Sequence, residues 1–315
     1  MPIVFEGATI SGGIFIEPYV PPAGSKAIFG YGESARSMTN LVSNTGVVAN
    51  DVAGVGTGRH SLAAAAYGTD KAIFGYGEAP GEQYSMTNKV SNTGVVATDT
   101  SGVGTARFRL AAAGYGTDKA IFGYGTTDGG SGVVSITNLV SNTGVVATNT
   151  TGVGSQRQGP AAASYGSTGQ AIFGYGQLST SQQTSITNLV TNTGVVGNNV
   201  TGVGTGRREL AATGYGTDKA IFGYGIDIGA QVLSMTNLVS NTGVVSTDTT
   251  GVGTARYGPA AAGYSTDKAI FGYGNNNSYV AVSITNLVSN TGVVGNDVTG
   301  VGTARQALAA ASYGS

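Results

Sequence analysis

Short apolar runs separated by polar, glycine-rich segments recur along most of the chain. In one representative stretch the runs cover residues 110–115, 120–124, 136–141 and 145–148. Runs of this length are typical of β-strands and too short for most helices. The Asn142-Thr143-Gly144 segment between the last two runs favours a tight hairpin, because glycine adopts positive φ without steric cost. No segment has the 3.6-residue period of an amphipathic helix. The pattern therefore predicts an all-β fold with four short strands per unit.

This four-strand unit is repeated six times. The string Ala-Ile-Phe-Gly-Tyr-Gly begins at residues 27, 72, 120, 171, 220 and 269, so the period is 45–51 residues. Each unit ends in a Gly-Val-Gly segment followed closely by arginine. A period of this length with glycine and aromatic markers is typical of a β-propeller blade. We therefore predict that residues 26–315 form a six-bladed β-propeller with four-stranded antiparallel blades.

The two ends of the repeat region are predicted to share a blade. Five units have an alanine-rich first strand before the Ala-Ile-Phe-Gly run, but the first unit has Pro-Pro-Ala-Gly at residues 21–24 instead. The missing strand is found at the other end of the chain, at residues 308–314. We expect this C-terminal strand to join the first blade and close the ring, because an open ring would expose unpaired strand edges.

The order of elements in each unit resembles the kelch repeat. Both have an arginine, a first strand, a turn, an apolar strand ending in glycine, a variable loop and a later hairpin. Two features differ, since Gly123-Tyr124-Gly125 replaces the kelch Gly-Gly pair and the chain contains no tryptophan. The units are also similar to repeats of phage structural and tail-fibre-type proteins. The first resemblance implies a kelch-like propeller, and the second implies a virion protein.

Composition excludes much enzyme chemistry. The chain has no cysteine and one histidine, which removes disulfides and thiolate metal sites and leaves little for zinc binding or histidine catalysis. A carboxylate pair on one face remains the enzymatic alternative, but nothing pairs the acidic residues in sequence. We therefore expect no enzyme activity, no catalytic residue, no metal and no cofactor. These acidic residues are Glu33, Glu78, Glu82, Asp128, Asp227 and Glu209.

Charge and hydropathy also limit the partners. The formal net charge is −1, whereas nucleic-acid binding needs a concentrated positive field. No apolar run approaches the roughly 20 residues that cross a bilayer. The N-terminus has neither the basic start nor the apolar run of a signal peptide. We therefore expect no nucleic acid partner and no membrane insertion.

Variation among the six copies is concentrated in two sets of residues. In an antiparallel blade, the loop between strands two and three lies at the same end as the link to the next blade. Both sets are therefore predicted to share one face, here called the variable face, and the Thr-Asp-Lys and Asn-Thr-Gly turns the opposite, constant face. Drift in unconstrained loops is the alternative to recognition. The sets are loops 33–36, 78–84, 126–134, 177–184, 226–233 and 275–282, and pairs 60–61, 108–109, 158–159, 208–209, 257–258 and 306–307.

The variable loops share almost no residues, so one asymmetric partner or one site near the axis is expected rather than a pocket in every blade. Aromatic platforms with amide and guanidinium donors suit a saccharide or a protein epitope equally. The candidate ligand-binding residues are Tyr84, Phe108, Tyr257, Tyr279, Gln83, Gln182, Gln183, Asn276 and Arg208.

Tyrosine and arginine occur at fixed repeat positions. Twelve of 16 tyrosines either end the first strand or lie in the Gly-Tyr-Gly segment after the second, and we expect them to pack between blades. The arginines are predicted to bridge blade backbones through their planar donors, with an anion-binding ring around the channel mouth as the alternative. This axial arginine ring consists of Arg59, Arg107, Arg157, Arg207, Arg256 and Arg305.

These features favour a non-enzymatic binding module, a phage fibre or receptor-binding protein that recognises a host-surface glycan or protein through the variable face. The alternative is a structural virion decoration or spacer protein without a receptor role. Residues 1–25 are interpreted as an attachment or linker segment that contacts other virion proteins, with a disordered tail or an extra edge strand as alternatives. The expected location is the surface of a virion, with the cytoplasm as the alternative.

Overall fold

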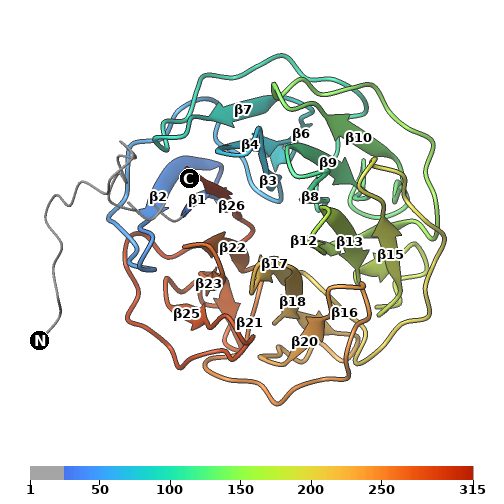
Figure 1. Cartoon of the computed structure of the whole chain (residues 1–315). Coiled ribbons are helices and arrows are strands. Elements are labelled where there is room, and N and C mark those ends of the chain that lie inside the picture. The colour runs from blue at the N-terminus through green and yellow to red at the C-terminus, as the bar shows by residue number, and fades with distance from the viewer. Residues whose placement is uncertain (1–24, 315) are drawn as a thin grey trace, which may run out of the picture.

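The computed structural model describes residues 25–314, and every regular element within them is a β-strand. Six three-stranded antiparallel sheets repeat along this part of the chain. Figure 1 shows these sheets arranged like blades around a common centre, with one strand of each sheet lying innermost. The all-β prediction is confirmed, and the repeated blade-like sheets are compatible with a propeller-like repeat fold. The proposed attachment segment lies outside the described residues, apart from Ser25.

The strands fall into four groups by position. The inner strands are β3 (Ala63–Tyr67), β8 (Ala111–Tyr115), β12 (Ala161–Tyr165), β17 (Ala211–Tyr215), β22 (Ala260–Tyr264) and β26 (Ala309–Tyr313). The middle strands are β1 (Lys26–Gly32), β4 (Lys71–Gly75), β9 (Lys119–Gly123), β13 (Gln170–Gly174), β18 (Lys219–Gly223) and β23 (Lys268–Gly272). The outer strands are β2 (Arg36–Val42), β7 (Thr87–Val90), β10 (Thr137–Val140), β15 (Thr187–Val190), β20 (Thr236–Val239) and β25 (Thr285–Val288). Two-residue strands form small sheets at one end: β5 (Glu78–Ala79), β6 (Glu82–Gln83), β11 (Arg157–Gln158), β14 (Gln177–Leu178), β16 (Arg207–Arg208), β19 (Ile226–Asp227), β21 (Arg256–Tyr257) and β24 (Asn275–Asn276).

The predicted fourth strand is reduced to isolated bridges, so the four-strand expectation needs correction. In the third repeat, Val146 bridges to Val140 and Thr150 bridges to Thr137 of β10. Three positions separate the two residues on β10, whereas four separate their partners. The outermost segment therefore carries one extra residue, which interrupts the ladder as a β-bulge does. The same two bridges recur in every repeat.

The repeated Phe-Gly-Tyr string packs neighbouring sheets together. The ring centroid of Phe74 lies 5.1 Å from that of Tyr31 in the preceding sheet. Phe74 also covers Gly30, where an added Cβ would lie 2.7 Å from the phenylalanine Cζ. All six repeats have this contact, which includes Phe29 against Tyr273. The expected packing of these tyrosines between blades is confirmed, and the glycine is required because the neighbouring ring occupies its side-chain space.

The C-terminal strand β26 pairs with β1, with Lys26 opposite Tyr313 and Gly30 opposite Ala309. The first sheet thus has the order β2-β1-β26 and joins segments from both ends of the described chain. Inner strand β26 also lies beside inner strands β3 and β22 of the two adjacent sheets. The C-terminal strand β26 therefore pairs with the first apolar strand β1, as the sequence predicts.

Backbone hydrogen bonds link successive sheets at the end that carries the Thr-Asp-Lys turns. In each case the residue after an inner strand donates its N–H to a carbonyl in the turn of the next sheet, at 2.6–2.8 Å. The sixth bond returns to the sheet that contains Gly68, where the series starts, so the bonds form a closed cycle. The donors Gly68, Gly116, Gly166, Gly216, Ser265 and Gly314 bind Asp118, Gly169, Asp218, Asp267, Ser25 and Asp70, respectively.

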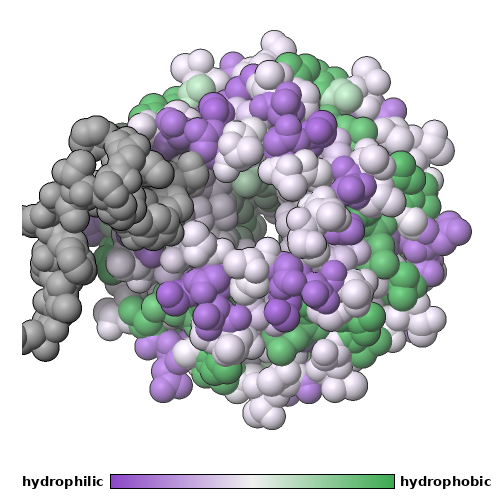
Figure 2. Space-filling view, in the orientation of Figure 1, coloured by the Kyte–Doolittle hydropathy of each residue, from purple (hydrophilic) through white to green (hydrophobic). Residues whose placement is uncertain are grey.

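Small side chains of the inner strands leave space along the axis. Cavities lined by alanine, glycine, serine and threonine of these strands continue into a 360 Å³ cavity at the constant face and a 270 Å³ cavity at the opposite end. Figure 2 shows one face with a hollow at its centre and irregular patches of hydrophilic and hydrophobic side chains around it. The alanines of the inner strands therefore keep the centre from filling with side chains.

Candidate functional site

The two variable sets meet at the end of each sheet opposite the Thr-Asp-Lys turns. The first residue of each pair after the repeat arginine lies against the first residue of a variable loop. His60 bridges to Glu78, and Tyr257 of β21 pairs with Asn275 of β24. Short backbone ladders therefore hold the start of each variable loop beside the pair that precedes the inner strand. Such ladders fix where variable side chains begin and leave the loop tips free to differ.

The second residue of each variable pair belongs to a ring of backbone hydrogen bonds around the axis. Each N–H donates to the equivalent carbonyl of the preceding repeat at 2.7–3.0 Å, and each residue has a φ of 50–63°. The cycle holds four side chains of different chemistry and two glycines around one opening. Its members are Ser61, Arg109, Gly159, Glu209, Gly258 and Ala307.

The 270 Å³ cavity lies at this opening. Its deeper wall is aliphatic, because the residue after each ring position is leucine or proline, and this wall continues into the next cavity along the axis. Its upper wall is polar on several sides. The polar residues are Glu33, His60, Ser61, Glu78, Arg109, Glu209 and Gln306. The cavity is therefore asymmetric in chemistry although the scaffold around it is repetitive.

Contacts between ionisable side chains organise this polar wall. His60 Nδ1 lies 3.6 Å from Glu78 Oε1, and Arg109 Nε lies 4.0 Å from Glu209 Oε1. Arg208 Nη1 donates to the same Glu209 oxygen at 2.5 Å. The Glu209 carboxylate therefore draws two guanidinium groups to one side of the opening.

Burial shifts the protonation of the His60–Glu78 pair. Burial lowers the pKa of His60, with the nearby Arg109 charge acting in the same direction and Glu33 opposing it. Burial raises the pKa of Glu78, although Arg109 and Ser61 oppose that change. The imidazole is therefore mainly neutral at pH 7, and the Glu78 carboxylate is only partly compensated by its neighbours.

The predicted aromatic contacts do not form one platform. Tyr257 and Tyr279 come together in the last repeat, with ring centroids 5.9 Å apart in a T-shaped arrangement. Tyr279 is 62% exposed, whereas Phe108 is only 4% exposed and lies under the guanidinium of Arg109. Tyr84 is half-buried in another repeat. Only the Tyr257–Tyr279 pair therefore presents a joint aromatic surface.

The predicted polar contacts are spread over several repeats. Gln83 and Gln182 are exposed, while the Nε2 of Gln183 lies 3.5 Å from the carbonyl oxygen of Asp227. The Asn276 Oδ1 accepts hydrogen bonds from the N–H groups of Ser278 and Val280, so it shapes its own loop. Arg208 donates a hydrogen bond to the Glu209 carboxylate beside the opening. These residues share the variable face without forming a single cluster.

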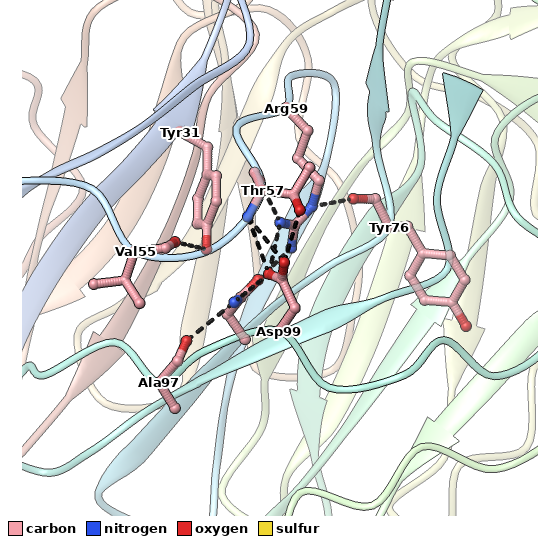
Figure 3. A network of polar contacts seen from close by, with 8 residues as sticks. Tyr31, Val55, Thr57, Arg59, Tyr76, Ala97 and Asp99 are labelled. Carbon is pink, nitrogen blue, oxygen red and sulfur yellow. Dashed lines mark hydrogen bonds and ion pairs between the residues drawn. The ribbon is translucent and has the colours of Figure 1, made fainter. Parts of the chain in front are cut away.

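The repeated arginines lie between sheets and do not line the axial cavities. Arg59 is fully buried and donates from Nε to Tyr76 O at 2.7 Å and from Nη2 to Asn88 Oδ1 at 2.7 Å. Its guanidinium carbon lies 4.5 Å from the ring centroid of Tyr31 in the preceding sheet (Figure 3). This burial leaves no room for the alternative of an exposed anion-binding ring, since each guanidinium is covered by protein. Arg107, Arg157, Arg207, Arg256 and Arg305 have equivalent cation–π contacts.

A carboxylate completes this arginine network in four repeats. Asp99 accepts from the Thr57 N–H at 2.9 Å and from Asn88 Nδ2 at 2.8 Å, and it lies 4.0 Å from Arg59 (Figure 3). Burial alone would raise the pKa of Asp99, but the hydrogen bonds from Asn88 and Thr57 and the charge of Arg59 lower it below its usual value. These contacts tie the link before the inner strand to the outermost segment of the same sheet.

Sequence reasoning missed the residues that gather at the axial opening. Glu33, Glu78 and Glu209 are predicted to share the variable face, and His60 and Arg109 belong to variable pairs, but none is selected as a ligand contact. Their positions in the sequence could have identified these residues, because each lies just before an inner strand or just after a middle strand. Both positions lie close to the axis when the alanine-rich strand is innermost.

Comparison of the sequence with known protein families and with curated proteins finds no match. Residues 25–314 contain no helix that could cross a membrane. They also contain no group of three or more acidic or histidine side chains arranged to hold a metal ion.

Proposed function

We propose that the chain is a closed six-bladed, kelch-like β-propeller that acts as a non-enzymatic binding module. The pairing of β26 with β1 and the two cycles of backbone hydrogen bonds support closure. In this proposal the propeller holds six unlike loops in fixed positions, and the variable face contacts one asymmetric partner. A rigid scaffold suits this role because loops can change without loss of the core.

One observation supports recognition most strongly. Sequence differences among the repeats gather on the variable face, where loops 78–84 and 275–282 share almost no residues, while the turns of the constant face are nearly unchanged. The partner we propose is a host-surface glycan or protein. The similarity of the units to phage structural and tail-fibre-type repeats favours a virion setting, in which residues 1–25 would join the module to other virion proteins.

Adsorption to cells tests this function. Labelled protein is mixed with a panel of candidate host bacteria, with and without periodate oxidation of surface sugars. We expect adsorption to at least one host, and loss after periodate would assign the receptor to a glycan. Tyr279→Asn should reduce adsorption because it removes the most exposed aromatic ring among residues 25–314 and because asparagine suits the positive φ of 58°. Absence of adsorption throughout the panel would contradict the receptor role.

A structural spacer or decoration role is the second candidate, and exposed valines favour it. One valine in each Asn-Thr-Gly-Val turn is 61–66% exposed and is valine in all six repeats, although nearby exposed positions vary. Apolar side chains repeated on one face are typical of packing against another subunit. Val293→Ser, with Val244→Ser in the same chain, should weaken assembly but leave cell adsorption unchanged if both faces have separate roles. These valines are Val47, Val95, Val145, Val195, Val244 and Val293.

A further inference from the structure

The 270 Å³ axial cavity of the variable face has two layers of different polarity. Leucine and proline side chains form its deeper wall, and charged side chains surround its opening. A ligand that fits must therefore place an apolar surface inward and polar groups toward the opening. A pyranose ring has this form, because its C–H face is apolar and its hydroxyl groups project from the edge. The small volume suits one sugar unit rather than a chain.

The charges at the opening favour a cationic group. Glu33, Glu78 and Glu209 supply three carboxylates, while Arg109 and Arg208 supply two guanidinium groups, both near Glu209. Glu33 has no ion pair within residues 25–314, and Glu78 has only the long contact with His60. Arg109 offsets the Glu78 charge only in part, so a protonated amine placed beside Glu33 and Glu78 would gain favourable interaction, whereas an acidic sugar would be repelled.

The hydrogen-bonding groups also match a sugar edge. Ionised carboxylates only accept hydrogen bonds, so Glu33 and Glu78 suit an ammonium group and hydroxyl hydrogens. Arg109, which also lines the opening, can donate to hydroxyl oxygens. The glycine positions Gly159 and Gly258 add no side chains to the ring, which leaves the remaining sides open for the sugar to enter.

From this combination we propose that the axial cavity binds one amino-sugar unit with a free, protonated amine, with its apolar face toward the leucine and proline wall. The inference rests on the proposed glycan-binding function and assigns its central subsite. The ammonium group lies between Glu33 and Glu78, and Arg109 and Glu209 contact the ring hydroxyls. Binding at this subsite requires no change in the backbone ring.

Titration of the full chain followed by NMR tests this subsite. D-glucosamine is the probe, and N-acetylglucosamine, glucuronic acid and butylamine are the comparison ligands. We expect D-glucosamine, at up to about 10 mM, to shift resonances of residues around the opening more strongly than any comparison ligand. The preference should weaken with added salt, because the carboxylates are solvent-accessible at the opening.

Matched variants locate the binding. Glu78→Gln should weaken D-glucosamine binding by about tenfold or more, because it removes a carboxylate beside the ammonium group. Glu82→Gln removes the same charge from an exposed position on the same loop, outside the cavity, and should have little effect. Thermal unfolding of both variants verifies that the fold is intact.

Each result decides the assignment. Absence of D-glucosamine binding, or equal binding of N-acetylglucosamine or glucuronic acid, overturns the amino-sugar subsite. Equal binding of butylamine overturns the sugar part of the assignment. Periodate-sensitive adsorption to cells together with failed D-glucosamine binding would leave the receptor function standing and remove only this subsite. Specific D-glucosamine binding without adsorption to any host would support the subsite and contradict the receptor function.

Discussion

The ring of Phe74 occupies the space in which a side chain of Gly30 would stand. A Cβ at residue 30 would lie 2.7 Å from Phe74 Cζ and 3.1 Å from Cε1, and Phe74 is fully buried. Gly30→Ala should therefore lower the free energy of unfolding by about 1–3 kcal/mol, because the phenylalanine must leave its packed position. Guanidinium unfolding followed by circular dichroism measures this loss.

Gly197→Ala is the matched control for this substitution. A Cβ at residue 197 would meet only the Leu189 carbonyl oxygen, at 3.4 Å, and three other repeats have alanine there, at residues 49, 97 and 147. We expect an unchanged or slightly higher unfolding midpoint. Equal destabilisation by the two substitutions would contradict the role assigned to the Phe74–Gly30 contact.

Arg207 is expected to be poorly replaced by lysine. Its Nε donates to Tyr224 O at 2.8 Å, its Nη2 donates to Asn237 Oδ1 at 2.7 Å, and its guanidinium carbon lies 4.4 Å from the Tyr175 ring centroid. A lysine ammonium cannot satisfy these acceptors from one buried point, so Arg207→Lys should cost about 3 kcal/mol in unfolding free energy. Equilibrium unfolding in guanidinium measures the change.

Arg36→Lys provides the comparison for the buried arginine. Arg36 is a half-buried residue at the start of outer strand β2. Its replacement should change the unfolding free energy by less than about 0.5 kcal/mol, as is typical away from buried networks. If both variants lose similar stability, the cost reflects a general intolerance of lysine rather than the buried network around Arg207.

Most strands could be predicted from the sequence because six copies repeat the same pattern. The predicted run 120–124 matches β9, Lys119–Gly123, with a shift of one residue. Tyr124 falls outside the strand because its φ is 63°, a conformation that bulky residues rarely adopt. The predicted outermost strand is not a continuous strand in the structure, because one extra residue between Val146 and Thr150 interrupts its pairing. The alternation of apolar residues in the sequence does not indicate this bulge.

The candidate site was less predictable than the fold. Strand order places the variable pairs and loops at one end of each sheet, which is enough to group Glu78 with Glu209 on one face. The distance of each residue from the axis depends on the backbone ring that turns residue 109 and its equivalents inward. Phe108 illustrates the limit, since a variable aromatic residue looks like a contact in sequence but is buried under Arg109.

Acid stability should depend on the four carboxylates of the arginine network. The hydrogen bonds and the arginine charge hold the pKa of Asp99 below its usual value of 3.8, although burial alone would raise it. Such a group stabilises the folded state above the unfolded-state pKa, and this stability is lost as the pH falls through the lower folded-state pKa. Thermal unfolding should therefore show a falling midpoint below about pH 4. The equivalent residues are Asp51, Asp248 and Asp297, whose pKa values are also lowered.

Asparagine at these four positions should flatten the acid limb of that profile. The chain already has Asn149 and Asn199 at the equivalent positions of two repeats, so the substitution is compatible with the fold. The control replaces three surface carboxylates that pair with lysine, Asp70, Asp118 and Asp218, by asparagine. The surface variant should keep most of the acid dependence because exposed ion pairs contribute little. A greater loss of acid dependence in the surface variant than in the network variant would contradict the role of the arginine network.

Removal of the C-terminal strand should destabilise the whole domain. Deletion of residues 306–315 leaves β1 without the partner that pairs from Lys26 to Gly30. It exposes a strand edge and the apolar surface that β26 covers, so we expect a large fall in melting temperature or aggregation. Differential scanning calorimetry and light scattering measure the two effects. An unchanged melting transition would show that the pairing of β26 with β1 contributes nothing to the stability of the fold.

A circular permutant tests whether the two ends of the repeat region lie in one blade, because it joins them without removing any strand. Because Lys26 pairs with Tyr313, a short glycine-serine linker can join residue 314 to residue 25. New termini are placed in the exposed loop at residues 129–131, within which Gly130 has open space around it. This permutant keeps every strand and every inter-sheet contact, so its melting temperature should lie close to that of the parent while the truncated chain unfolds far below both. A permutant that fails to fold, or that melts with the truncated chain, would mean that the ends of the repeat region do not meet as one blade.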